Sequence, residues 1–280
     1  SSKWVKPARY LLTLVINSLK TTLPVNSAKI CNTYGIFYWT CMMNNETPLG
    51  GHISKRFDNE LEDIRNKVLT MGGLVETQLN NGILALMESD SAIAQQVSSE
   101  DYKINAMEVE IDSQCVEILA RRQPAASDLR LIVAIIKTIT DLERIGDQAE
   151  KLGRFELELI DEGSTSTQYA KLEHLGKLVS KMLGNALNSF ARLDDAVALK
   201  TIKKNKKVND EYEALMRQLI TLMMEDPRTI KNALRVSWCA RALERVGDHA
   251  INICEYVLFL KHGKDVRHIA YKEVKKQLSF

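Results

Sequence analysis

An eight-residue block occurs twice in this chain, first as Leu142-Glu143-Arg144-Ile145-Gly146-Asp147-Gln148-Ala149 and 101 residues later as Leu243-Glu244-Arg245-Val246-Gly247-Asp248-His249-Ala250. Six of the eight positions are identical. The upstream residues repeat in the same order, with a proline at 124 and 227 and, before it, an apolar residue followed by asparagine at 104–105 and 208–209. Two long stretches that repeat in register indicate a duplicated structural unit.

Around both blocks, apolar residues recur every three or four positions, as they do on one face of an α-helix. Six such stretches begin near residues 57, 104, 132, 172, 208 and 230. Only 13 glycines and 5 prolines interrupt the 280 residues, and no long segment alternates between polar and apolar residues as a strand would. We therefore predict an all-α fold of two tandem three-helix bundles, built from six long antiparallel helices.

The pattern also divides the chain. We expect the first three-helix repeat over residues 43–162, the second over 163–265 and a C-terminal tail over 266–280. Residues 1–42 hold five basic side chains, no acidic one and no helical periodicity. A signal peptide or a transmembrane helix fits them less well, because a cleavage site is missing and the apolar runs are short. We favour a leader outside the fold, either an upstream extension or a sequence added for expression.

The overall composition is that of a globular protein, with 45% hydrophobic and 26% charged residues. The net charge of +2 gives no electrostatic case for nucleic-acid binding. Five cysteines without CxxC spacing argue against a disulfide framework or a zinc knuckle. Three of them, Cys115, Cys239 and Cys254, have apolar neighbours at helical spacing, so we expect them to be buried thiols in a reducing compartment.

Each block carries two acids four residues apart, Glu143 with Asp147 and Glu244 with Asp248, which places both carboxylates on one helix face. Like charges at this spacing are destabilising, so a compensating cation is expected. A glycine between the acids interrupts the helix interior, as it would where another helix or a ligand comes close.

A neighbouring helix adds a further pair, Glu108 and Asp112. Two such helices packed side by side would bring four carboxylates within reach of a hard cation, because oxygen ligands suit Mg²⁺, Ca²⁺, Mn²⁺ or iron.

Two features of the sequence leave the metal interpretation open. Arg144 and Arg245 each precede an acid by three residues, so each acid could be one partner of an ordinary helix ion pair. The second copy also has Tyr212 and Met216 where the first has Glu108 and Asp112, which makes its site less complete. His249 is a candidate extra ligand, but we favour the interpretation that its side chain is exposed to solvent.

The two blocks, the start Pro124-Ala125-Ala126-Ser127-Asp128 and the segment from Ile104 to Glu108 resemble the PhoU family of phosphate-specific transport accessory proteins. The resemblance spans about residues 46–262. It implies a cytoplasmic protein, commonly a homodimer, that acts as a negative regulator of the phosphate-starvation response. It further implies an adaptor between a PstB-type transporter ATPase and a PhoR-type sensor histidine kinase, attached to the membrane through protein partners only. It also implies metal binding, with Mg, Mn, Fe or Zn as candidate ions and the ligands Glu108, Asp112, Glu143, Asp147, Glu244 and Asp248.

Two other functions compete with this one. A carboxylate-bridged di-metal enzyme would need Glu-x-x-His on buried helix faces, and the five histidines do not supply that motif. The sequence also contains no P-loop and no nucleophile elbow. We therefore expect no catalytic residues and no enzyme. A metal-independent helical adaptor is the second alternative, and it differs from the family interpretation only at the acidic sites.

Overall fold

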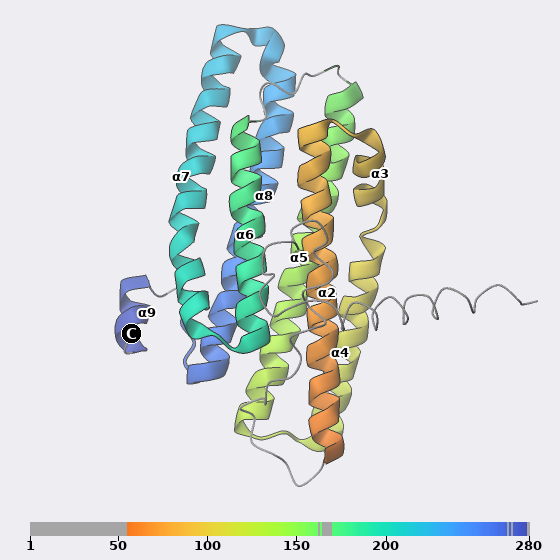
Figure 1. Cartoon of the computed structure of the whole chain (residues 1–280), viewed down its shortest axis with the longest axis vertical. Helices are drawn as coiled ribbons and strands as arrows, with labels where there is room; N and C mark the ends of the chain where they lie inside the picture. Colours follow the sequence, from red (N-terminus) through yellow and green to blue (C-terminus); the bar gives the residue numbers. More distant parts are fainter. Residues whose placement is uncertain (1–54, 162, 164–169, 268, 270, 279–280) are drawn as a thin grey trace, which may run out of the picture. The chain divides into compact units, whose positions relative to one another are not determined.

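The apolar stripes of the sequence become the buried faces of long helices (Figure 1). The computed structural model describes residues 55–161, 163, 170–267, 269 and 271–278, so the predicted leader 1–42 lies outside the described residues. The helices, in chain order, are α2 (Lys55–Glu88), α3 (Ser91–Ser99), α4 (Tyr102–Arg122), α5 (Ala126–Asp161), α6 (Ala170–Arg192), α7 (Asp195–Glu225), α8 (Ile230–His262) and α9 (Tyr271–Gln277).

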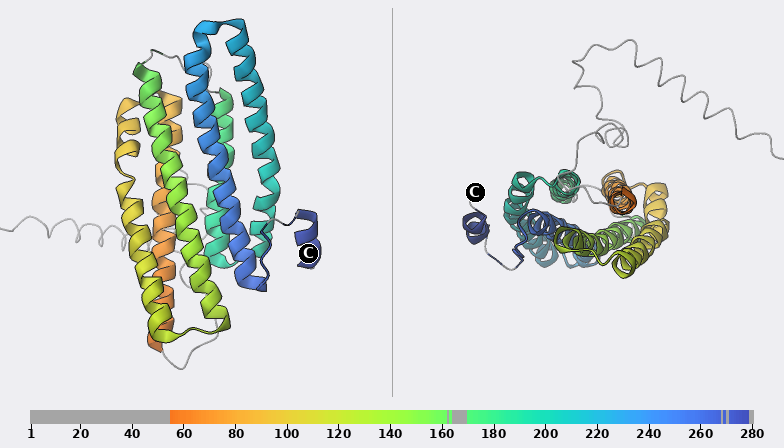
Figure 2. Two further views of the ribbon diagram at one scale, coloured as in Figure 1. Left: turned by 180° about the vertical axis from the view of Figure 1, so that it is seen from behind. Right: turned by 90° about the horizontal axis from the view of Figure 1, so that it is seen from below.

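These helices pack as two bundles of like construction. In the first, α5 packs against α2, α3 and α4, and in the second α8 packs against α6 and α7. The bundles meet where α5 lies along α8 and where α2 lies along α6 (Figure 2). No strand occurs in the described ranges. The predicted all-α fold of two three-helix bundles is confirmed, and α9 adds a short helix within the segment expected to be a tail.

The middle helix differs between the copies in a way that the periodicity did not predict. In the first copy it is broken into α3 and α4 near Glu100, whereas α7 runs through the corresponding region unbroken. The starts are nonetheless equivalent. Asp90 accepts hydrogen bonds from the backbone N–H groups of Ala92 and Ile93, and Asp194 accepts one from Val197. These side chains satisfy N–H groups that have no partner within the helix.

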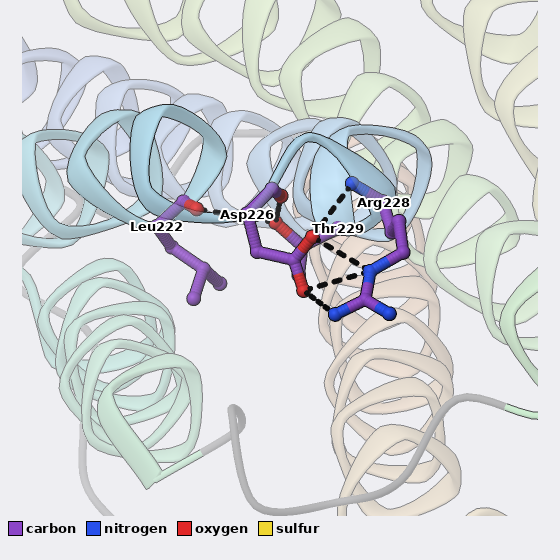
Figure 3. Close-up of polar contacts among 4 residues, drawn as sticks. All are labelled: Leu222, Asp226, Arg228 and Thr229. Carbon is purple, nitrogen blue, oxygen red and sulfur yellow. Dashed lines mark hydrogen bonds and ion pairs between the residues drawn. The ribbon is translucent and has the colours of Figure 1, made fainter.

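The third helix of the second copy begins after a short turn that Figure 3 shows. Pro227 starts the 3₁₀ turn η2 (Pro227–Thr229), where its missing N–H costs nothing. The Asp226 carboxylate accepts from the backbone N–H and the guanidinium of Arg228. The Thr229 hydroxyl donates to the carbonyl oxygens of Leu222, 3.3 Å away, and Asp226, 2.7 Å away. The turn thus ties the end of α7 to the start of α8.

A buried carboxylate joins the two copies at the contact between α5 and α8. Asp141, 5% exposed, accepts hydrogen bonds from Asn252 at 2.9 Å and from the hydroxyl of Tyr256 at 2.8 Å. His249 Nδ1 lies 2.7 Å from the same carboxylate. The expectation of a solvent-exposed His249 is therefore wrong, because the residue is only 9% exposed and its ring lies against Asp141. A buried carboxylate needs such partners to offset its lost hydration.

The other joint, between α2 and α6, shows the duplication in its packing. Leu187 of α6 lies against Gly72 of α2, and Ile83 of α2 lies against Gly176 of α6. Each residue of one pair is 104 positions from its counterpart in the other pair. The two copies therefore face each other across this joint with a local twofold relation.

The three cysteines of the described helices are buried, and the helices are not of the membrane-spanning kind. Cys115, Cys239 and Cys254 are free and buried, as expected. Burial raises the pKa of the Cys115 thiol to about 12, so the thiol stays protonated at neutral pH. None of the described helices has the length and apolar character that crossing a bilayer requires.

The close packing of α3 on α5 gives a stability test. A Cβ on Gly153 would lie 2.7 Å from the carbonyl oxygen of Ala94, so Gly153→Ala should force the two backbones apart. We expect it to lower the free energy of unfolding by about 1–3 kcal/mol. Gly73→Ala is the control, because nothing lies within 4 Å of its Cβ position. That change should raise the free energy of unfolding by up to ~1 kcal/mol through helix propensity. Urea denaturation of both variants measures the difference, and equal effects would contradict the packing described.

Candidate functional site

The acids predicted as metal ligands come from two adjacent helices of the first copy. Glu108 and Asp112 lie on α4, and Glu143 and Asp147 lie on α5. Gly146 faces α4 at close range, since a Cβ there would be 3.0 Å from the Cδ1 of Ile104. The glycine is thus needed for helix packing, as its position between the two acids suggested.

A fifth carboxylate, that of Asp101, joins this group at the start of α4. Its Oδ1 atom would lie 3.1 Å from a Cβ on Gly146. Its Oδ2 accepts a hydrogen bond from Asn105 at 2.8 Å, whereas the buried Oδ1 has no hydrogen-bond partner. Such an atom is unusual, because buried polar atoms are nearly always paired. We call Asp101, Glu108, Asp112, Glu143 and Asp147 the first acidic cluster.

Sequence reasoning missed Asp101, although a signal for it was present. Aligning the copies on Asn105 and Asn209 places Asp101 opposite Asn205. Both residues face the glycine of their own copy, because Asn205 Oδ1 would lie 3.6 Å from a Cβ on Gly247. A polar residue at the same place in both copies could have directed attention to this position.

The carboxylates of the cluster affect one another electrostatically. Burial raises the pKa of Glu143, and Asp147, Glu108 and Asp101 raise it further. Burial likewise raises the pKa of Glu108, with Asp112 and Asp147 adding to the effect and Thr140 and Arg144 opposing it. The pKa of Asp101 is raised by burial and by Asp147, whereas Asn105, the nearby Gln78 amide and Lys151 oppose the rise. Negative charge therefore concentrates between α4 and α5.

Two basic side chains offset part of this charge. Arg144 is exposed and lowers the pKa of Glu143 and of Glu108. Lys151 Nζ lies 4.0 Å from Asp147, whose side chain is 43% exposed. An ion pair this long and this exposed contributes little. The cluster therefore has five carboxylates but only two nearby basic side chains, of which Arg144 is exposed and Lys151 is distant. It is short of positive charge.

The donor set of the cluster fits a hard cation, but its present geometry is open. Carboxylate oxygens are the ligands that Mg²⁺, Ca²⁺ and Mn²⁺ prefer. In the described part of the chain, however, no three or more His, Cys, Asp or Glu side chains are already placed to hold a metal ion. A cation would therefore have to draw the side chains together, and the unpartnered oxygen of Asp101 is available for that.

The second copy brings fewer acidic side chains together. Burial raises the pKa of Glu244, Asp248 raises it further, and Arg241 and Arg245 lower it. Arg241 also forms an ion pair with Glu244 at 2.9 Å, so the copy supplies its own cation. In α7, Asn205, Tyr212 and Met216 occupy the positions of the acids of α4. The structure thus brings together the acids of the first copy, whereas Glu244 and Asp248 have no acidic counterparts at those positions.

Comparisons with known proteins agree with the duplicated architecture. The PhoU domain matches residues 68–155 and again residues 172–257, once in each copy. The chain is 50% identical over 236 residues to the phosphate-specific transport system accessory protein PhoU homolog of Pseudomonas aeruginosa, covering 84% of this chain and 98% of the relative. It is 47% identical over 231 residues to the PhoU accessory protein of Escherichia coli, covering 82% of this chain and 95% of the relative.

Solved structures show the same arrangement of helices. The crystal structure of PhoU from Pseudomonas aeruginosa matches with a TM-score of 0.73 at 51% identity, over 75% of this chain and all of that chain. The phosphate transport system regulatory protein PhoU from Streptococcus pneumoniae matches with a TM-score of 0.70 at 30% identity, over 75% of this chain and 99% of that chain. With both copies matched, and with relatives at this identity matched over nearly their whole length, the chain belongs to the PhoU family.

Proposed function

We propose that this protein is a non-catalytic regulator that keeps the phosphate-starvation response off and modulates high-affinity phosphate uptake. In this proposal it acts in the cytoplasm as a homodimer and as an adaptor between a PstB-type transporter ATPase and a PhoR-type sensor histidine kinase. The observation that carries the proposal is the match to named phosphate-transport accessory proteins over both copies and over 98% of the Pseudomonas aeruginosa relative. Long paired bundles offer two extended helical surfaces on which such partners could dock.

We further propose that the first acidic cluster holds a divalent cation of the Mg²⁺ or Mn²⁺ type. Supporting this are the five carboxylates on α5, at the start of α4 and along α4, the raised pKa values of Glu143, Glu108 and Asp101, and the Asp101 Oδ1 atom without a hydrogen-bond partner. A bound cation would supply the positive charge that the cluster lacks and would fasten α4 to α5. In the second copy, Arg241 lies 2.9 Å from Glu244 and supplies part of the compensating positive charge.

A metal-independent adaptor is the competing function, and one observation favours it. As described above, the carboxylates do not yet converge on one point. In that case, side-chain repulsion within the cluster would be relieved by solvent, by Arg144 and by Lys151. Titration with Mn²⁺ separates a cation-binding regulator from a metal-independent adaptor.

Calorimetric titration with Mn²⁺ tests the cation site on the full chain freed of metal. We expect Glu143→Ala with Asp147→Ala to weaken Mn²⁺ binding by at least ~10-fold, since two of the carboxylates are lost. The matched control is Glu244→Ala with Asp248→Ala, the same change in the second copy, which should leave the affinity within about twofold. Equal losses in both variants, or no Mn²⁺ binding by the unchanged protein, would count for the metal-independent adaptor.

The like-charge repulsion can be measured without any metal. Asp101→Asn introduces the residue that the second copy has at the equivalent position, Asn205, and it should stabilise the metal-free protein at neutral pH by roughly 0.5 kcal/mol. Because the folded state raises the pKa of Asp101, the folded protein binds its proton more tightly than the unfolded chain does. The stability of the unchanged protein therefore falls as the pH rises from the pKa of Asp101 in the unfolded chain through its raised pKa in the folded protein. The stability difference between the two proteins should widen from acidic to neutral pH in urea unfolding, and a constant difference would contradict the assignment.

The regulatory proposal is tested in cells. Deleting the gene should switch on phosphate-starvation promoters in phosphate-rich medium, because the negative regulator is gone. A tagged protein should co-purify with the PstB-type ATPase and with the PhoR-type kinase, whereas a tagged unrelated helical protein should not. A deletion strain whose phosphate-starvation promoters stay off in phosphate-rich medium would contradict this function.

A further inference from the structure

The outward face of α4 carries a stripe without a single charged side chain. Three of its members are large and open to solvent, with Tyr102 65%, Val109 68% and Val116 55% exposed. Three small exposed residues, Ala106, Ser113 and Ala120, lie between and beyond them. These six residues, called here the α4 seam, cover almost the full length of the helix.

The spacing of the α4 seam is that of a helix–helix contact. Its members follow one another by four and three residues in turn, from 102 to 120, which is the heptad pattern of a coiled-coil seam. At 100° per residue, all six lie within about 40° of one line along the helix. That line is opposite the buried residues Ile104, Ile111 and Ile118, so the α4 seam points straight away from the bundle core.

The second copy shows that the fold does not require this stripe. The corresponding positions of α7, which the alignment on Asn105 and Asn209 defines, are also exposed. The first four of them are charged. The residues of α7, in order, are Lys206, Asp210, Glu213, Arg217, Ile220 and Met224. An outer face of this middle helix can thus be fully solvated, and the apolar character of α4 needs a separate reason.

We propose that the α4 seam is the interface at which a second copy of this chain docks, with the two α4 helices antiparallel. In that orientation the heptad positions pair so that each large side chain meets a small one. Tyr102 would face the second copy's Ala120, Val116 would face its Ala106, and Val109 would face its Ser113. Large-to-small matching in every layer lets the helices approach closely, as packing of ridges into grooves requires.

The charges beside the α4 seam favour a second copy in this orientation. Lys103 and Glu117 form ion pairs within their own copy with Glu100 and Arg121. Lys103 would also lie near the second copy's Glu117, and Glu117 near the second copy's Lys103, so opposite charges meet at two places across the interface. Between them, Glu110 would face Glu110 of the second copy. Its charge is already neutralised within its own copy by an ion pair with Lys67. On the other side Asp112 would face its own counterpart, which costs the interface some affinity.

The position of α4 leaves room for this contact. It packs against α2 and α5 on its inner side, and it lies at the end of the first bundle that is farther from α7 and α8 (Figures 1 and 2). A second copy docked there would extend the array of helices from its first bundle and would leave the second bundle of each copy at the far ends. This assignment of the interface rests on the homodimer of the proposed function.

Exchanging the seam residues for those of α7 tests the interface on the full chain. Ala106→Asp, Val109→Glu and Ser113→Arg together place the α7 residues on α4, so the helix should fold as before. By sedimentation equilibrium we expect the unchanged protein to dimerise and the exchanged variant to have a dissociation constant roughly 100-fold higher or more. The control, Asp210→Asn with Glu213→Gln and Arg217→Gln on α7, should dimerise like the unchanged protein. An unchanged protein that is monomeric at about 100 µM, or an exchanged variant that dimerises as tightly as it, would overturn the proposal.

Cross-linking tests the antiparallel orientation directly, in a chain whose Cys31 and Cys41 are replaced by serine. Ala106→Cys with Val116→Cys should form a disulfide-linked dimer on mild oxidation, because the two positions face each other only between copies. Ala106→Cys alone should not, since its partner position then holds valine. Asp210→Cys with Ile220→Cys is the matched control on α7 and should stay monomeric on denaturing gels. Cross-linking through Ala106→Cys alone, or equally through α7, would overturn the orientation. Both readouts use purified protein, so a failure of phosphate regulation in cells would count against the proposed function and not against this interface.

Discussion

The close approach of α4 to α5 at Gly146 is the constraint on which the candidate site depends. The absent side chain lets Ile104 and Asp101 lie close to α5 at this point, between Glu143 and Asp147 in the sequence of that helix. A Cβ at this position would lie 3.0 Å from Ile104 Cδ1 and 3.1 Å from Asp101 Oδ1, so both side chains would have to shift away from α5. Burial of Glu143 and Glu108 is the largest reason for their raised pKa values. The helix packing that buries these acids therefore also sets their charge.

Duplication explains both the likeness and the differences of the two bundles. The copies share their capping aspartates, which start a helix, and their glycines and buried stripes, which serve packing. They differ where packing does not decide the residue, namely at the acids of α4 and on the outer face of the middle helix. The second copy thus acts as an internal reference. A feature that the first copy has and the second lacks is not required by the fold, so it points toward binding.

Much of the fold could be predicted from the sequence, because helical periodicity is a local property that repeats over many turns. The stripe from Phe57 to Leu79 is buried as expected, and the PhoU domain matches once around each repeated block. The break between α3 and α4 could not be predicted, since the apolar spacing continues on both sides of it. Nor could α9, whose few turns give too little pattern to recognise.

The site was predicted in part for the same reason. Acids four residues apart on one helix are visible in sequence, and their pairing with Glu108 and Asp112 followed from the packing of neighbouring helices. Asp101 was missed because it stands at a helix start, outside any periodic face. The Asp141 network was missed because it joins residues more than 100 positions apart, and His249 was misjudged with it. Contacts between copies leave no local signature in the residues that make them.

The most direct measurement of the central claim is anomalous X-ray scattering from crystals grown or soaked with Mn²⁺. If the first copy alone has been equipped with a cation site, the strongest protein-bound anomalous peak should lie between α4 and α5, within ligand distance of carboxylates of the first acidic cluster. A peak of equal height beside Glu244 and Asp248, or no peak at the first acidic cluster at saturating Mn²⁺, would contradict the account.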